Sequence, residues 1–140
     1  MSQRFATDIL IIGGGAAGLA AALHLADLYR VTLLSKGSME SGSSNWAQGG
    51  IAAVTDPIDS LESHESDTIT AGSGLCHLDT VKTVVESAPL VIEQLSQWGV
   101  DFDLRGNEYH LTKEGGHSNR RILHVADATG KAIIEVLTQK

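Results

Sequence analysis

The chain has 140 residues, of which 42% are hydrophobic and 4% aromatic, and its formal charge is −7 at pH 7. This length suits one modest domain, and an acidic chain without clusters of Lys and Arg lacks the groups that bind a phosphate backbone, so we expect no nucleic acid partner. The single cysteine, Cys76, excludes an internal disulfide and leaves any zinc site dependent on scattered histidines, so we expect no metal and a reducing, cytoplasmic setting.

The first residues, Met1–Thr7, are too few and too polar for a secretory leader. The apolar span that follows, Ile9–Ala26, contains four glycines and leads into polar residues. A membrane-spanning helix needs a longer uninterrupted apolar stretch, so we expect this span to fold within a domain.

A glycine motif follows directly after an apolar run. The run Ile9–Ile12 predicts a parallel strand that is buried on both faces. Gly13, Gly15 and Gly18 then form GxGxxG at the start of an Ala- and Leu-rich helix over residues 16–30. Such glycines allow a tight turn, close approach of a pyrophosphate, and close packing of helix on strand, while the amides at the helix start face the negative charge. The pattern predicts an α/β, Rossmann-like domain that binds a dinucleotide, although glycines can also merely shape a loop.

A second strand over residues 31–35 is expected to be followed by an acidic residue that holds the ribose hydroxyls. Ser35 and Lys36 stand there instead. The missing carboxylate weakens an NAD interpretation, and Lys36 can place a positive charge beside the adenosine ribose or phosphate. The alternative for Lys36 is an ordinary solvated surface lysine.

Residues 37–54 are rich in Gly and Ser and contain one tryptophan. A loop of this length is usually functional or disordered. Its apolar end and the pair Gly49–Gly50, which lets the backbone approach a flat ligand, favour a loop that lines a cofactor.

Two helices are predicted next. Residues 59–72 have the polar spacing of a surface helix, with Asp59 or Ser60 as its cap and Gly72 and Gly74 at its end. His64 is expected to be either a surface residue or a residue with local hydrogen bonds.

Residues 79–98 have apolar side chains at helical spacing, and Pro89 predicts either two short helices or one kinked at 87–88. Gly99 ends this region, and the alternation over residues 100–104 predicts an edge strand. Short strands within 107–116 and 120–127 and an amphipathic helix over 128–140 complete the chain.

Four segments together resemble the start of the L-aspartate oxidases, a family within the succinate dehydrogenase and fumarate reductase flavoprotein superfamily. They are residues 8–26, 31–37, 41–54 and 109–130. The resemblance implies an FAD enzyme that oxidises L-aspartate to iminoaspartate, with oxygen or fumarate as the electron acceptor. It also implies a place before quinolinate synthase in NAD biosynthesis.

The resemblance implies which residues hold the cofactor. They are Gly13, Gly14, Gly15, Ala16, Ala17 and Gly18 at the pyrophosphate, Ser35 and Lys36 at the ribose, and Ser43, Ser44, Asn45, Trp46, Ala47, Gln48, Gly49 and Gly50 around the flavin. The respiratory relatives attach the flavin to a histidine in this last segment, where Ser43 stands here. Residues 38–48 contain no histidine, which implies non-covalent FAD.

The resemblance also implies where the substrate binds. Glu114 matches an acidic residue that meets the substrate ammonium, and His117 lies close to it in sequence. A carboxylate here can select aspartate over a simple dicarboxylate, whose enzymes carry an apolar aromatic residue at this place. The alternative for Glu114 is a solvated residue in a glycine-rich turn. Secondary candidates for orienting substrate or flavin are Arg120, Arg121 and His124, although arginine pairs at strand starts are commonly surface charges.

The family's catalytic arginine and histidines are expected downstream of this chain, and no catalytic residue is assigned within it. The resemblance implies that residues 1–140 are the N-terminal part of an FAD-binding domain, without the capping and C-terminal helical domains. Two alternatives stay open: a fumarate reductase or succinate dehydrogenase flavoprotein subunit, and a non-catalytic nucleotide-binding module.

Overall fold

The computed structural model describes residues 6–140, which form two compact units. One unit comprises the chain up to Gln48 together with Gly130–Lys140, and the other comprises Gly49–Thr129. Most of the segment on which the expectation of no secretory leader rests lies outside the described residues.

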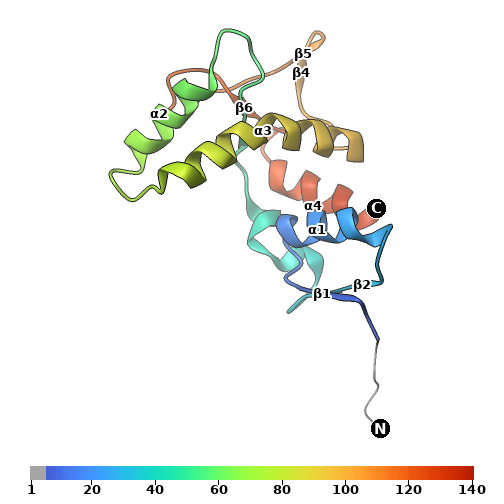
Figure 1. Ribbon diagram of the computed structural model, residues 1–140. Helices are drawn as coiled ribbons and strands as arrows, with labels where there is room; N and C mark the ends of the chain where they lie inside the picture. The colour runs from blue at the N-terminus through green and yellow to red at the C-terminus, as the bar shows by residue number, and fades with distance from the viewer. Residues whose placement is uncertain (1–5) are drawn as a thin grey trace. The chain divides into compact units, whose positions relative to one another are not determined.

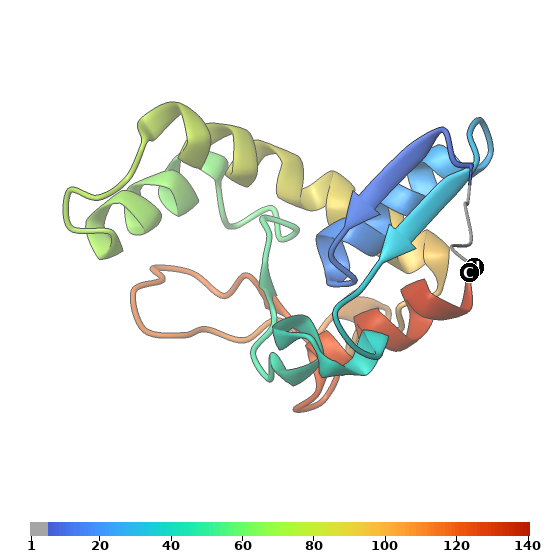
Figure 2. The same cartoon turned by 90° about the horizontal axis from the view of Figure 1, so that it is seen from below.

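The first unit begins with a strand, a helix and a second strand. The strand β1 (Ile9–Ile12) pairs in parallel with β2 (Val31–Leu34), and α1 (Ala16–Ala26) packs against both (Figure 1, Figure 2). The backbone amide of Arg30 donates to the Asp8 carboxylate at 2.9 Å, which ties the starts of the two strands together. The predicted strand–helix–strand order is confirmed, and the helix ends earlier than residue 30.

The prediction that the first strand is buried on both faces is wrong for this chain. Ile9 and Ile11 are half-buried, whereas Leu10 and Ile12 are 53% and 78% exposed. Successive side chains of a strand point to opposite faces, and α1 packs against this two-stranded sheet. One face of β1 is therefore covered and the other exposed, although the side chains on both faces are apolar.

The segment after β2 is more ordered than the predicted plain loop. It contains two 3-10 helices, η1 (Met39–Ser41) and η2 (Ser43–Trp46). The predicted closing helix is confirmed as α4 (Thr129–Gln139), in which the Gly130 amide donates to the Ala47 carbonyl at 2.9 Å. The start of α4 therefore lies directly against the loop that precedes Gly49.

Two helices dominate the second unit. The helix α2 (Leu61–Ala71) packs beside α3 (Leu78–Trp98), as Figure 1 shows. Ser60 caps α2, because its hydroxyl accepts a hydrogen bond from the Ser63 amide at 3.1 Å. Pro89 lies inside α3 without dividing it, so the two-helix alternative is wrong. Buried apolar residues on both sides of the proline support the helix: Val85 before it, and Ile92 and Leu95 after it.

Short strands complete the second unit. The strand β3 (Ile51–Ala52) pairs antiparallel with β6 (Ile122–Leu123), and β4 (Leu104–Arg105) pairs antiparallel with β5 (Glu108–Tyr109). The predicted edge strand over residues 100–104 is wrong except for its last residue. Alternate side chains there are buried, but the segment forms no strand ladder, which explains why alternation alone was misleading.

Within residues 6–140 no helix combines the length and the apolar character needed to cross a membrane. In the same part of the chain, no group of three or more His, Cys, Asp or Glu side chains could hold a metal ion.

Candidate cofactor and substrate sites

The glycine turn after β1 has a geometry that side chains would prevent. Gly13 has φ +124°, a conformation that L side chains rarely adopt, and its amide donates to the Leu34 carbonyl at 2.9 Å. A Cβ atom placed on Gly18 would lie 1.9 Å from the Gly13 carbonyl oxygen. The close contact of α1 with the turn therefore requires glycine at this position.

The start of α1 presents backbone amides. Gly15 is its N-cap residue, and the Ala16 amide donates to the Ser44 hydroxyl at 3.3 Å. The first turn, which includes Ala17, contains no acidic residue. The first amides of a helix lack partners within the helix and carry its positive dipole end, so this end favours an anion.

A pocket of about 510 Å³ adjoins this turn. Its lining includes Gly13, Gly14, Gly15, Ser35 and Lys36, so the structure brings together five residues predicted to bind the cofactor. A Cβ atom placed on Gly13 would meet no other atom within 4 Å, so the backbone here is open to a ligand. Exposed backbone, a lysine and no acidic lining residue fit the pyrophosphate and ribose of a dinucleotide.

Residues 43–50 of the predicted cofactor loop are not part of that pocket's lining, although the Ser44 hydroxyl lies against the start of α1. The Asn45 side-chain oxygen is buried and has no hydrogen-bond partner among the described residues, whereas Trp46 is 74% exposed. A buried acceptor without a partner is a group that a bound ligand can satisfy.

In the second unit the end of this loop meets the predicted substrate residue. A Cβ atom on Gly50 would lie 2.1 Å from the Leu123 carbonyl oxygen, so glycine permits the close approach to β6. A Cβ atom on Gly49 would lie 3.6 Å from Oε1 of Glu114. Glu114 is exposed, and its carboxylate forms no hydrogen bond or ion pair within residues 6–140. The structure therefore brings an available carboxylate beside the predicted flavin segment.

Glu114 lies on a loop, residues 113–120, that is closed at its base by backbone hydrogen bonds. The Thr112 amide donates to the Ile122 carbonyl at 3.0 Å, and the Arg121 amide donates to the Thr112 carbonyl at 3.2 Å. Within the loop, the His117 amide donates to the Glu114 carbonyl at 3.2 Å. We call this segment the 113–120 loop.

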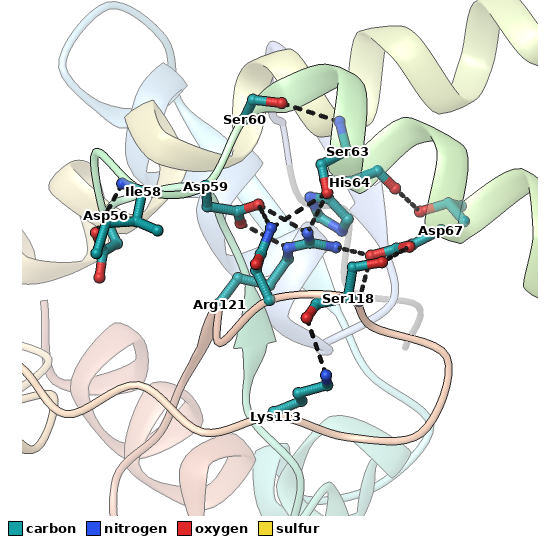
Figure 3. Close-up of polar contacts among 12 residues, drawn as sticks. Asp56, Ile58, Asp59, Ser60, Ser63, His64, Asp67, Lys113, Ser118 and Arg121 are labelled. Atoms are coloured by element: carbon teal, nitrogen blue, oxygen red, sulfur yellow. Dashed lines mark hydrogen bonds and ion pairs between the residues drawn. The ribbon is translucent and has the colours of Figure 1, made fainter.

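Arg121 forms a buried ion-pair cluster with α2 and the residues before it (Figure 3). Its Nε and Nη2 atoms donate to the two carboxylate oxygens of Asp59 at 2.7 and 2.8 Å, and Nη1 donates to Asp67 at 2.6 Å. The Arg121 side chain is 0% exposed, so the interpretation of this arginine as a surface charge is wrong. Ser63 accepts a further bond from Nη2 at 3.2 Å.

Two neighbours of Arg121 bind the same carboxylates. The Ser118 amide and hydroxyl each donate to Asp67 at 2.6 Å, and the Asn119 side chain donates to Asp59 at 2.7 Å. These Ser118 bonds, together with Arg121, hold the pKa of Asp67 well below its usual range. Burial alone would raise the pKa of Asp59, but its bonds from Arg121 and Asn119 outweigh burial and lower it.

His64 lies behind this cluster. It is buried, and its ring contacts that of the half-buried His117 edge-on, with centroids 5.8 Å apart. Of the two alternatives for His64, the surface position is therefore wrong. Burial, and then the Arg121 charge, lower the pKa of His64. Within the described chain, the Nδ1 atoms of both histidines are buried without a hydrogen-bond partner.

The remaining secondary candidates are engaged elsewhere. His124 bonds through Nδ1 to Asp103 at 3.1 Å and through Nε2 to Nδ1 of His110 at 3.1 Å. Arg120 is exposed and donates to the Leu111 carbonyl at 3.4 Å. The sequence interpretation missed Asp67 and the pairing of Asp59. The available signal was their spacing of four residues on either side of Ser63: Ser63 and Asp67 lie one turn apart on α2, and Asp59 directly precedes its cap Ser60.

The chain is similar to known flavoproteins. Residues 8–140 match the family described as FAD binding domain. The L-aspartate oxidase of Pseudomonas aeruginosa is 52% identical over 98% of this chain and 27% of its own length, and that of Synechocystis is 49% identical over 93% and 24%. Among solved structures, an E. coli quinol fumarate reductase has a TM-score of 0.92 at 34% identity, covering 99% of this chain and 24% of its own. The chain therefore spans about a quarter of the length of these relatives.

Proposed function

We propose that this chain, which belongs to the FAD binding domain family, forms the N-terminal part of an L-aspartate oxidase. FAD is the cofactor of this family. Identities near 50% to several L-aspartate oxidases support the substrate assignment. We also propose that the capping domain, the C-terminal helical domain and the catalytic residues lie outside these 140 residues.

The residues of the glycine turn and the start of α1 are proposed to hold the FAD pyrophosphate through backbone amides. Ser35 and Lys36 would bind the adenosine ribose, and residues 43–50 would line the flavin. With Ser43 in place of a histidine, the cofactor would be held without a covalent bond. When bound, FAD supplies the hydride acceptor for the oxidation of L-aspartate to iminoaspartate.

The single observation that carries the substrate proposal is the position of Glu114. Its exposed carboxylate, without a partner of its own among the described residues, lies beside Gly49 of the predicted flavin segment. An amino-acid substrate offers an ammonium that a simple dicarboxylate lacks, so a carboxylate at this place favours aspartate. We propose His117 as a second substrate-binding residue.

The test compares Glu114→Gln with wild type in the complete protein that contains this chain. We expect kcat/KM for L-aspartate oxidation to fall about 10- to 100-fold, because a charge-assisted hydrogen bond is lost. Fumarate reduction should stay within about twofold, since fumarate has no ammonium. Glu108→Gln, another exposed carboxylate of the same unit, is the matched control. Equal losses with both substrates would contradict the assigned role.

A fumarate reductase or succinate dehydrogenase flavoprotein is the second candidate, favoured by the similarity to quinol fumarate reductase. Oxidation of succinate but not L-aspartate by the complete protein would establish it. Release of a yellow, fluorescent cofactor by acid would argue against a nucleotide-binding module that carries no flavin. We further propose that oxygen or fumarate accepts the electrons in the cytoplasm, and that quinolinate synthase consumes the product in NAD biosynthesis.

A further inference from the structure

We propose that Asp67 is a positioning residue, which holds the 113–120 loop through Ser118 so that Glu114 meets the ammonium of an amino-acid substrate. This inference rests on the proposed function of Glu114. Asp67 itself would touch neither substrate nor flavin.

Asp67 uses both carboxylate oxygens to join the loop to α2. Oδ1 accepts the Ser118 hydroxyl, and Oδ2 accepts both the Ser118 amide and Nη1 of Arg121, each at 2.6 Å (Figure 3). The Asp67 side chain is only 12% exposed although its partner Ser118 lies at the surface. Two donors from one residue fix both the position and the orientation of the loop at this point.

The residues between Glu114 and Ser118 have little stiffness of their own. Gly115 and Gly116 adjoin Glu114, and Gly116 has φ +89°. Glycine has access to more backbone conformations than other residues, so such a segment holds one conformation only where other bonds impose it. Residues 113–118 make two further bonds among themselves: the His117 amide donates to the Glu114 carbonyl at 3.2 Å, and Lys113 Nζ donates to the Ser118 carbonyl at 2.9 Å.

Both of those bonds lie within the loop and move with it. The two bonds from Ser118 to Asp67 connect the loop to α2 only four residues from Glu114. One residue further on, Nδ2 of Asn119 donates to Asp59 at 2.7 Å and to Ser63 of α2 at 3.3 Å. Loss of the Ser118 hydroxyl leaves the bonds of Arg121 to Asp59 and Asp67 in place. A change at Ser118 can therefore loosen Glu114 without removing the buried ion pairs.

The experiment measures steady-state kinetics of the complete protein in two assays: oxidation of L-aspartate, and reduction of fumarate as the electron acceptor. We expect Ser118→Ala to raise KM for L-aspartate about 3- to 30-fold, and to leave fumarate reduction within about twofold. Asp67→Asn should act in the same direction, and Ser118→Thr, which keeps the hydroxyl, should restore KM. If Asp67→Asn does not fold, the Ser118 variants alone decide the matter.

Ser60→Ala is the matched control, because it also deletes a serine hydroxyl that stabilises α2. That hydroxyl caps the helix at the Ser63 amide. We expect Ser60→Ala to lower the melting temperature while KM for L-aspartate stays at the wild-type value. A KM increase in Ser60→Ala equal to that in Ser118→Ala would overturn the inference, because any weakening of α2 would then suffice.

A double-mutant cycle tests whether Asp67 and Ser118 act through Glu114. In a Glu114→Gln background, Ser118→Ala should leave KM for L-aspartate unchanged, because the carboxylate that it positions is gone. Equal fold-changes in both backgrounds would overturn the inference. If Glu114→Gln alone does not change the preference for L-aspartate over fumarate, the proposed function of Glu114 fails, and this inference with it. If Glu114→Gln lowers that preference but Ser118→Ala and Asp67→Asn keep wild-type KM, only the positioning inference fails.

Discussion

Replacing Arg121 with methionine removes the buried cation on which the polar centre of the second unit depends. Methionine keeps much of the apolar volume of the arginine stem but none of its hydrogen bonds. Asp59 then loses both bonds from the guanidinium, at 2.7 and 2.8 Å, and Asp67 loses one at 2.6 Å.

The size of the effect follows from how well each carboxylate is compensated afterwards. The Asp59 side chain is only 2% exposed and would keep the bond from the Asn119 side chain, whereas Asp67, which is 12% exposed, would keep both bonds from Ser118. Leaving a buried charge without its partner costs about 3–5 kcal/mol. We therefore expect Arg121→Met to destabilise α2 and β6 by about that amount, with Asp59 as the main source.

Hydrogen exchange of backbone amides measures this loss locally, even within a larger enzyme. The protection of amides in α2 and β6 should fall roughly 100- to 5,000-fold, since each 1.4 kcal/mol corresponds to a factor of about ten. Amide protection in Arg121→Lys should lie between that of wild type and that of Arg121→Met, because an ammonium cannot reproduce the two parallel bonds to Asp59. The protection of β1 and β2, which belong to the other unit, serves as the internal control.

A second substitution tests the assigned cause. Adding Asp59→Asn to Arg121→Met removes the uncompensated charge and should recover part of the lost protection. If the double variant is less protected than Arg121→Met, the cost does not come from an unpaired Asp59. Wild-type protection in Arg121→Met would refute the reasoning as a whole.

Two further predictions concern the glycine turn and pH. Gly18→Ala should lower FAD affinity at least about tenfold in a fluorescence titration, because the added Cβ would lie 1.9 Å from a backbone oxygen. A Cβ atom added at Gly42 would meet nothing within 4 Å, so Gly42→Ala should leave the melting temperature unchanged. The melting temperature should fall in two phases as pH decreases. The first fall, below about pH 6.5, comes from His64: the unfolded chain binds a proton on this histidine there, whereas in the folded protein its lowered pKa keeps it neutral. His64→Gln should therefore abolish this first fall. The second fall, below about pH 4, comes from Asp59 and Asp67, whose lowered pKa values mean that their contribution to stability is lost as they become protonated. A melting temperature that stays constant below about pH 4 would contradict this prediction.

The parts of the fold that the sequence predicts well are those encoded locally. A run of apolar residues, a glycine turn and an Ala-rich helix follow one another directly, so β1, α1 and β2 need no distant partner to be recognised. The Ser60 cap and the end of α3 at Gly99 are likewise set by adjacent residues. In contrast, the two faces of β1 look alike in composition, and only the packing of the chain distinguishes them.

The polar cluster could not be predicted with the same assurance because its members are distant in sequence. Arg121 lies 62 residues from Asp59, and an arginine at a strand start is usually a surface charge. His64 was misplaced for a related reason, since its burial depends on His117 and Arg121 rather than on its polar neighbours in α2. The resemblance to a family indicated Glu114 directly, but it gave no information on which groups hold the loop.

Fold similarity alone cannot decide between an amino-acid oxidase and a dicarboxylate enzyme. The chain superimposes on a quinol fumarate reductase with a TM-score of 0.92 at only 34% identity. Within this chain, the distinction proposed above rests on a side chain: Glu114 carries a charge on the 113–120 loop, whose position we assign to Asp67 and its partner Arg121. The charge that would meet the substrate and the bonds that position the loop thus belong to different residues. A carboxylate at the tip can be exchanged without disturbing the buried ion pairs, which gives such a fold a route to a different substrate preference at little cost in stability.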